Sequence, residues 1–199
     1  MLHTVIFIGR SGWGKGTQAE LLRNRVSEHD PDKHPILYVE TGEKFRHFVR
    51  GNSYSSLLSK KIMEADERQP NFLGAYMWAD VLINELGEHM HLILDGVARS
   101  RPEAEMITTA FKFYEREKPA VIYINVSREW SEKRLLARGR SDDVNLSRID
   151  KRLDWFDRDV VPALDYFKEN ASYRFIDVNG EQSIDKVHSD IVAAYEYRA

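Results

Sequence analysis

Residues 9–18 read Gly9-Arg10-Ser11-Gly12-Trp13-Gly14-Lys15-Gly16-Thr17-Gln18, a glycine-rich stretch between an apolar run and a helix-forming segment. The run before it, residues 5–8, is typical of a buried parallel strand, and residues 19–22 favour a helix. Glycine lets the main chain approach a ligand closely, so the N–H groups of such a turn can converge on phosphate oxygens. The stretch therefore predicts a phosphate-binding loop. Lys15 would reach the phosphates, and the next helix would point its positive N-terminus at them.

The spacing of Gly9 and Gly14-Lys15 fits a P-loop, although Gly16 takes the place of the usual Ser or Thr and Thr17 follows one position later. The alternative is a structural glycine turn with an incidental lysine. The strand–loop–helix context favours phosphate binding over that alternative.

Composition indicates one globular domain spanning residues 1–199. The chain is 42% hydrophobic and 31% charged, a balance typical of a folded domain with a proper core. The net charge of -3 argues against general nucleic-acid binding. No run is long enough for a membrane span, and the lack of cysteine fits a cytoplasmic protein. We expect a cytoplasmic monomer that binds neither nucleic acid nor membrane.

Four further apolar runs, at about 36–39, 91–95, 121–125 and 173–177, predict strands that alternate with helices. Such alternation predicts a parallel sheet covered on both faces, with ligands at the carboxyl ends of the strands. The expected class is α/β, a P-loop three-layer α/β/α fold with a five-stranded parallel sheet. Thr41-Gly42 should break the chain. A long helical tract with apolar residues three and four apart should precede the last strand.

Over nearly its whole length the chain resembles the adenylate kinase family of nucleoside monophosphate kinases. Residues 9–18 have that family's own form of the loop, with Gly16 after the lysine. Residues 41–46 resemble its Thr-Gly-Asp-x-x-Arg, and residues 95–99 resemble its Asp-Gly-Phe-Pro-Arg. The arginine-rich residues 134–152 resemble the lid of short-lid members, and residues 178–180 resemble the loop against the ATP base.

The resemblance implies reversible transfer of a phosphoryl group from ATP, with Mg²⁺ as cofactor, to a nucleoside monophosphate. Cations that hold phosphate charge are the main requirement of this chemistry, and the attacking phosphate oxygen needs no general base. The implied catalytic cations are Lys15, Arg99, Arg138, Arg140 and Arg152. The implied ATP site comprises Gly9, Gly12, Trp13, Gly14, Lys15, Gly16, Thr17, Gln18, Arg134 and Gly180. The implied acceptor site comprises Thr41, Gly42, Arg46, Gln69, Gly96, Arg99 and Glu103.

Asp95 would hold Mg²⁺ through water, with Thr17 assisting, and Trp13 would shield phosphate from water. Two small mobile parts are also implied, a helical acceptor-binding insertion at about 42–77 and a very short lid at about 138–147. The alternatives are that Asp95 only caps the turn after its strand and that the arginines of residues 134–152 form a solvated face.

Three departures from the family pattern bear on the acceptor. Ala98 stands where the family has a proline before the key arginine. Glu103 replaces a glutamine that reads adenine, and Gln69 replaces an apolar residue that lines the acceptor base. A carboxylate only accepts hydrogen bonds, which suits the two adjacent donors of guanine. The resemblance to the family therefore favours AMP as the acceptor, whereas the hydrogen bonding expected of Glu103 favours GMP or another monophosphate.

Two other functions are open. One is a kinase for a nucleoside or small alcohol, which would need a carboxylate base, and Glu43 is the obvious candidate. The other is a nucleotide-binding protein without catalysis. The number of converging cations argues against the second, because binding alone does not require so many.

Overall fold

Five parallel strands form the centre of the computed structural model, which describes residues 2–138 and 146–196. The strand order across the sheet is β2-β3-β1-β4-β5. All four pairs of neighbours are parallel. The strands are β1 (Thr4–Gly9), β2 (Ile36–Glu40), β3 (His91–Asp95), β4 (Ala120–Asn125) and β5 (Arg174–Asn179). The predicted five-stranded parallel sheet is thus confirmed.

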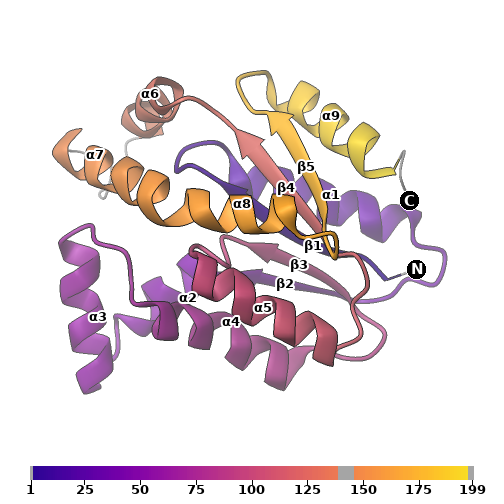
Figure 1. Ribbon diagram of the computed structural model, residues 1–199, viewed down its shortest axis with the longest axis horizontal. Coiled ribbons are helices and arrows are strands. Elements are labelled where there is room, and N and C mark those ends of the chain that lie inside the picture. Colours follow the sequence, from indigo (N-terminus) through magenta and orange to yellow (C-terminus); the bar gives the residue numbers. More distant parts are fainter. Residues whose placement is uncertain (1, 139–145, 197–199) are drawn as a thin grey trace.

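Helices cover both faces of this sheet because successive residues of each strand point to opposite sides. Val5 and Phe7 pack with α1 (Lys15–His29) and α9 (Ile184–Glu196). Ile6 and Ile8 pack on the other side with α4 (Asn71–Glu85), α5 (Arg101–Phe113) and α8 (Val161–Glu169). Figure 1 shows α4, α5 and α8 in front of the sheet and α1 behind it. The predicted three-layer architecture is confirmed.

The remaining helices gather at the end of the sheet to which the strand arrows point (Figure 1). They are α2 (Thr41–Phe48), α3 (Tyr54–Glu64), α6 (Arg128–Arg138) and α7 (Leu146–Trp155). The expected break at Thr41-Gly42 was wrong, since α2 begins directly at Thr41. The Thr41 hydroxyl donates to the Gly96 carbonyl at 2.7 Å, which fixes the start of α2 on the neighbouring strand end.

The long tract before β5 is helical but not uniform. A π-helical turn, η1 (Phe156–Val160), separates α7 from α8. Pro162, near the start of α8, lacks an N–H, and its ring excludes an ordinary α-helical bond to residue 158, which gives a reason for the wider turn. The predicted spacing of apolar residues, three and four positions apart, is confirmed because these residues are all buried: Ile149, Leu153, Phe156, Val160, Leu164 and Phe167.

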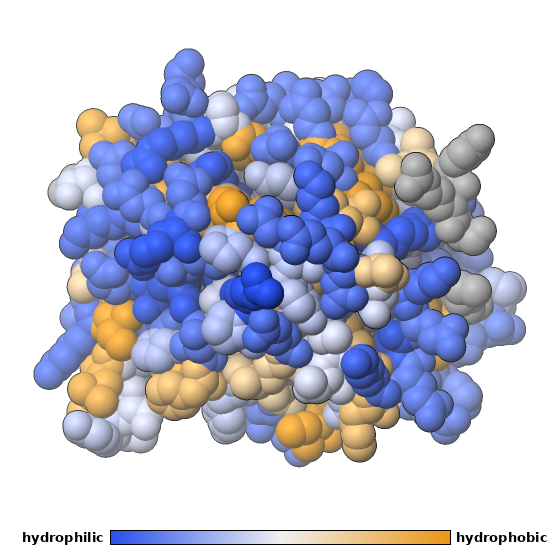
Figure 2. Space-filling view, in the orientation of Figure 1, coloured by the Kyte–Doolittle hydropathy of each residue, from blue (hydrophilic) through white to orange (hydrophobic). Residues whose placement is uncertain are grey.

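Hydrophilic residues dominate the face seen in Figure 2, and hydrophobic areas are scattered over it, some of them at the lower left, where α3 lies in Figure 1. Leu57 and Leu58 of α3 are 48% and 40% exposed. Among the helices of residues 2–138 and 146–196, none is both long enough and apolar enough to cross a membrane.

Candidate active site

The loop between β1 and α1 takes the conformation that its glycines allow. Gly12 and Gly14 have φ angles of +86° and +85°, in the left-handed region that favours glycine. Gly14 is the N-cap of α1, and in the part of the chain that the structure describes no side chain caps this helix. The space where Gly14 and Gly16 would carry a Cβ is open. The first N–H groups of α1 therefore face an accessible space, as an anion-binding loop requires.

The back of the loop rests on the core and on α6. The Trp13 indole lies against Gly9, whose missing Cβ would come within 2.4 Å of it. Trp13 is only 4% exposed and belongs to the cluster between the sheet, α1 and α9. Its indole therefore packs inward and does not cover the outside of the loop. Ser131 of α6 donates to the Ser11 carbonyl at 2.7 Å and holds the loop from the other side.

Gln18 points away from the loop. Its side chain is buried and donates to the Ile184 carbonyl, at the start of α9, at 2.9 Å. Gln18 thus joins α1 to the segment that follows Gly180. Thr17 is exposed, so its hydroxyl is accessible at the first turn of α1. The Lys15 side chain lies outside the described part of the structure.

Asp95 ends β3 beside the loop and is 3% exposed. It is the register partner of Phe7 in β1 and of Glu40 in β2, so the ends of three strands meet here. The Tyr38 hydroxyl donates to Asp95 Oδ2 at 3.2 Å. Burial, followed by the nearby Asp95 carboxylate, raises the pKa of Tyr38, which therefore stays a donor. A carboxylate at this position suits hard cations such as Mg²⁺.

Two arginines cover the glycines that follow β2 and β3. Arg99 Nε donates to the Gly96 carbonyl at 2.6 Å, and a Cβ at Gly96 would come within 2.4 Å of its guanidinium. Burial lowers the pKa of Arg99, while Asp95 and then Glu103 act in the opposite direction. Arg46 lies over Gly42 and pairs with Glu40 at 2.9 Å, with its side chain 51% exposed. A half-buried cation, Arg99, and an exposed cation, Arg46, thus lie at adjacent strand ends.

The two residues expected to contact the acceptor base both have partners in the protein. Gln69 donates to the Ser59 carbonyl at 2.9 Å and accepts from the Ser59 hydroxyl at 3.0 Å. Glu103 is buried and pairs with Arg68 at 2.9 Å. The sequence analysis missed Arg68, because nothing in the sequence links it to a residue 35 positions away.

Gly180, which the sequence analysis assigned to the ATP site, directly follows β5 and packs closely on β4. Its N–H donates to the Asn125 carbonyl at 2.8 Å, and a Cβ there would come within 2.6 Å of Ile124 and Val126. A hollow of about 260 Å³ adjoins it, lined by Asn125, Val126, Ser127, Asp177, Asn179 and Glu181. Arg134 is exposed on α6 and stacks on Trp130, 4.7 Å from the ring centre.

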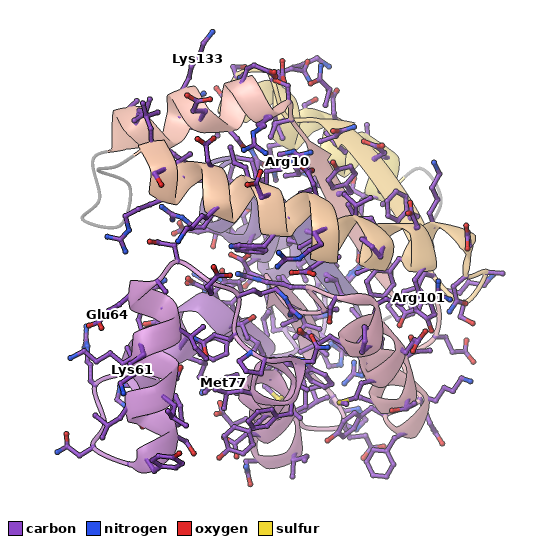
Figure 3. The ribbon with its side chains drawn as sticks, turned by 60° about the vertical axis from the view of Figure 1, so that its left-hand side comes forward. Arg10, Lys61, Glu64, Met77, Arg101 and Lys133 are labelled. Atoms are coloured by element: carbon purple, nitrogen blue, oxygen red, sulfur yellow. The ribbon has the colours of Figure 1, made fainter. Side chains whose placement is uncertain are left out.

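Of the expected lid cations, Arg152 is half-buried on α7. The Arg138 side chain and the whole of Arg140 lie outside the described residues. Arg10 of the loop, which the sequence analysis did not single out, pairs with Asp157 of η1 at 2.5 Å and lies 4.6 Å from the centre of the Phe156 ring. Figure 3 shows Arg10 next to the long helix that contains η1.

A second cluster with metal-ligand chemistry lies at the opposite end of the sheet. Single donor atoms of Asp30, His34 and His91 all lie within 4.8 Å of one another. However, the His3 N–H donates to His91 Nδ1 at 2.9 Å, so neutral His91 carries its proton on Nε2, the atom that faces Asp30 at 3.3 Å. A protonated nitrogen cannot bind a metal, and the cluster is better explained by hydrogen bonding.

Comparison with known proteins agrees with this geometry. The family model of adenylate kinase matches residues 7–172. The adenylate kinase of Leptospira biflexa serovar Patoc (strain Patoc 1 / Ames) is 30% identical over 195 residues, covering 96% of this chain and 98% of its own. That of Prochlorococcus marinus (strain AS9601) is 29% identical over 191 residues, covering 96% and 97%. The chain therefore belongs to the adenylate kinase family and is a phosphotransferase.

Proposed function

We propose that the chain is a nucleoside monophosphate kinase that converts ATP and AMP into two molecules of ADP. A phosphate oxygen of AMP attacks the γ-phosphorus of ATP, and the bond from that phosphorus to the β–γ bridging oxygen breaks. The electron pair of that bond leaves with ADP, so atoms and charges balance without a general base. The names of the relatives and the cations at the strand ends support this proposal.

The observation that carries the proposal is the placement of Arg99. Its guanidinium is held on the Gly96 carbonyl, one strand from the phosphate loop, and burial lowers its pKa. Arg99 is half-buried, and a positive charge that is partly withdrawn from water is stabilised when an anion binds to it. The monophosphate of AMP would supply that anion, with accessible Arg46 as a second contact.

Mg²⁺ fits the oxygen donors of this edge. Asp95 offers a buried carboxylate and Thr17 an accessible hydroxyl, which are the ligands that magnesium prefers, directly or through water. Bound with ATP, Mg²⁺ neutralises charge on its phosphates. Asp95 and Thr17 would hold the ion through their oxygen atoms, and the N-terminus of α1 would meet the phosphate oxygens.

We further propose that residues about 42–77 and about 138–147 close over the nucleotides. Closure would exclude water, which otherwise competes as acceptor and hydrolyses ATP. Lys15, Arg138, Arg140 and Arg152 would then surround the transferred group. Trp13 and Gln18 would support the phosphate loop from behind, as their burial suggests.

The test is ADP formation from Mg-ATP with AMP, GMP, CMP, UMP or dTMP offered separately. AMP should give the highest kcat/KM, and Arg99→Ala should lower that value by about three orders of magnitude or more. Arg101→Ala is the matched control, since Arg101 is two residues away, 59% exposed and paired only with Glu105 among the ion pairs of the described residues. A higher kcat/KM with GMP would show that GMP is the acceptor instead of AMP. Absence of ADP formation with every monophosphate would overturn the proposal.

A further inference from the structure

Arg68 connects the segment after α3 to three other parts of the chain. Its Nη1 donates to Glu103 of α5 at 2.9 Å, its Nε donates to Asp159 of η1 at 3.2 Å, and its Nη2 donates to Asn71 at the start of α4. The side chain of Arg68 is 16% exposed. These bonds use one N–H of each terminal nitrogen, and each carries two, so a second N–H remains on both.

Glu103 is closely surrounded by its neighbours, and its two carboxylate oxygens differ in how well they are hydrogen-bonded. Its side chain is 4% exposed, and a Cβ at Gly74 would lie 3.1 Å from its Oε1. Ser100 also donates to Oε1 at 3.3 Å, whereas Oε2 accepts only a long bond from the Arg99 N–H at 3.4 Å within the described residues. Burial raises the pKa of Glu103, and Arg68 opposes that shift.

The position of this pair is suited to an acceptor base. Glu103 is four residues beyond Arg99, the cation proposed for the acceptor phosphate, and its Oε2 contacts the Arg99 main chain. Arg68 comes from the connection between α3 and α4. In Figure 3 this part of the chain lies below the α7–α8 helix, with Lys61 and Glu64 marking α3. Gln69 is held by α3, whereas Arg68 and Glu103 pair with each other beside Asn71 and Ser100.

We propose that Arg68 determines the base preference of the acceptor site by supplying the hydrogen-bond donor that Glu103 lacks. The inference rests on the proposed function. Adenine presents an amino donor at N6 beside an acceptor at N1, so its complement is one acceptor beside one donor. The carboxylate of Glu103 and an N–H of Arg68 together provide that complement. A carboxylate alone suits guanine, which presents N1–H and the 2-amino group as two adjacent donors.

The experiment compares kcat/KM for AMP and for GMP in four proteins: wild type, Arg68→Met, the double variant Arg68→Met with Glu103→Gln, and Arg158→Met. In Arg68→Met the ratio of AMP to GMP should fall at least tenfold, because the donor is lost and an unpaired carboxylate remains. In the double variant the ratio should return to within about threefold of wild type, because one carboxamide both donates and accepts. Arg158→Met should leave the ratio unchanged, since Arg158 pairs with the same Asp159 but is 65% exposed.

A purely structural role for Arg68 predicts a different result, in which kcat/KM falls equally for AMP and GMP and their ratio stays at the wild-type value. That outcome would overturn the inference while leaving the proposed function intact. Absence of turnover with every monophosphate in wild type would instead overturn the proposed function. If Arg68→Met does not fold, Arg68→Lys replaces it, because one ammonium cannot reproduce the fork of a guanidinium. A ratio that falls at least threefold supports the inference, and an unchanged ratio overturns it.

Discussion

Ala98 adopts a backbone conformation that the family's proline could not. Its φ angle is +53°, in the left-handed region, whereas the ring of proline fixes φ near −65°. Ala98 is fully buried and directly precedes Arg99. Arg99 is therefore positioned without the family's proline. The turn is made by Gly96 and Ala98 with positive φ, and the Gly96 carbonyl holds the guanidinium.

Restoring the family pattern with Ala98→Pro should therefore harm this protein. We expect a loss of more than about 1 kcal/mol in the free energy of unfolding, because the new residue is incompatible with the native backbone. The kcat/KM for AMP should also fall, because Arg99 would move. Urea unfolding and the coupled assay measure the two effects. Ala98→Gly, which accepts positive φ, should stay within about 1 kcal/mol of wild type. A stabilised Ala98→Pro would contradict the left-handed turn.

At the level of elements, the connection between α3 and α4 is held by α7. Arg148 Nε pairs with Asp66, whose side chain is 7% exposed, and Arg148 Nη2 donates to the Glu64 carbonyl at 3.5 Å. Lys151 Nζ donates to the Ala65 carbonyl at 3.4 Å. Since α7 begins at the end of the proposed lid, these contacts would join the proposed lid to the proposed acceptor-binding insertion.

Asp66→Asn should weaken this connection and loosen the acceptor insertion. We expect the KM for AMP to rise several-fold with a smaller change in kcat, and amide hydrogen exchange in residues 54–68 to become faster. A double-mutant cycle with Arg148→Gln should give a coupling energy of about 0.5 to 3 kcal/mol. Glu64→Gln is the control, because only the main chain of Glu64 contacts Arg148. Additive effects of the two substitutions would show that the pair does not couple the two sides.

Sequence reasoning succeeded where one local signal decides an element. The apolar runs predicted the five strands of the described residues, most clearly β1 and β3, which are almost wholly buried. Gly12 and Gly14 indicated a turn that needs positive φ. It failed where partners are distant in sequence. The inward turn of Trp13, the bond from Gln18 to α9 and the pairing of Arg68 with Glu103 depend on tertiary packing. No spacing rule within one segment encodes such contacts.

At the scale of the whole molecule, the two ends of the sheet carry different sets of polar residues. The carboxyl end carries the phosphate loop and the arginines, whereas the amino end, near both termini in Figure 1, carries a group of histidines. His3 precedes β1, His91 begins β3, and Asp30 follows α1. His3 also hydrogen-bonds the Tyr195 hydroxyl of α9 at 2.6 Å. Protonation at this end therefore affects four elements and the stability of the whole fold.

The free energy of unfolding should fall as the pH is lowered from 7 towards 5. Burial lowers the pKa of His91, and of His3, from the ordinary value of 6.5. Below about pH 6.5 the unfolded chain therefore binds protons that the folded chain does not, and the stability present at higher pH is lost as the pH falls through the folded pKa. Protonation of His91 Nδ1 would also break its bond from the His3 N–H.

Urea unfolding between pH 5 and 8 measures how steeply the free energy of unfolding changes with pH. This slope should be smaller in His91→Gln and unchanged in the control His47→Gln, whose side chain is exposed. An equal slope in wild type and His91→Gln would place the pH dependence elsewhere in the fold.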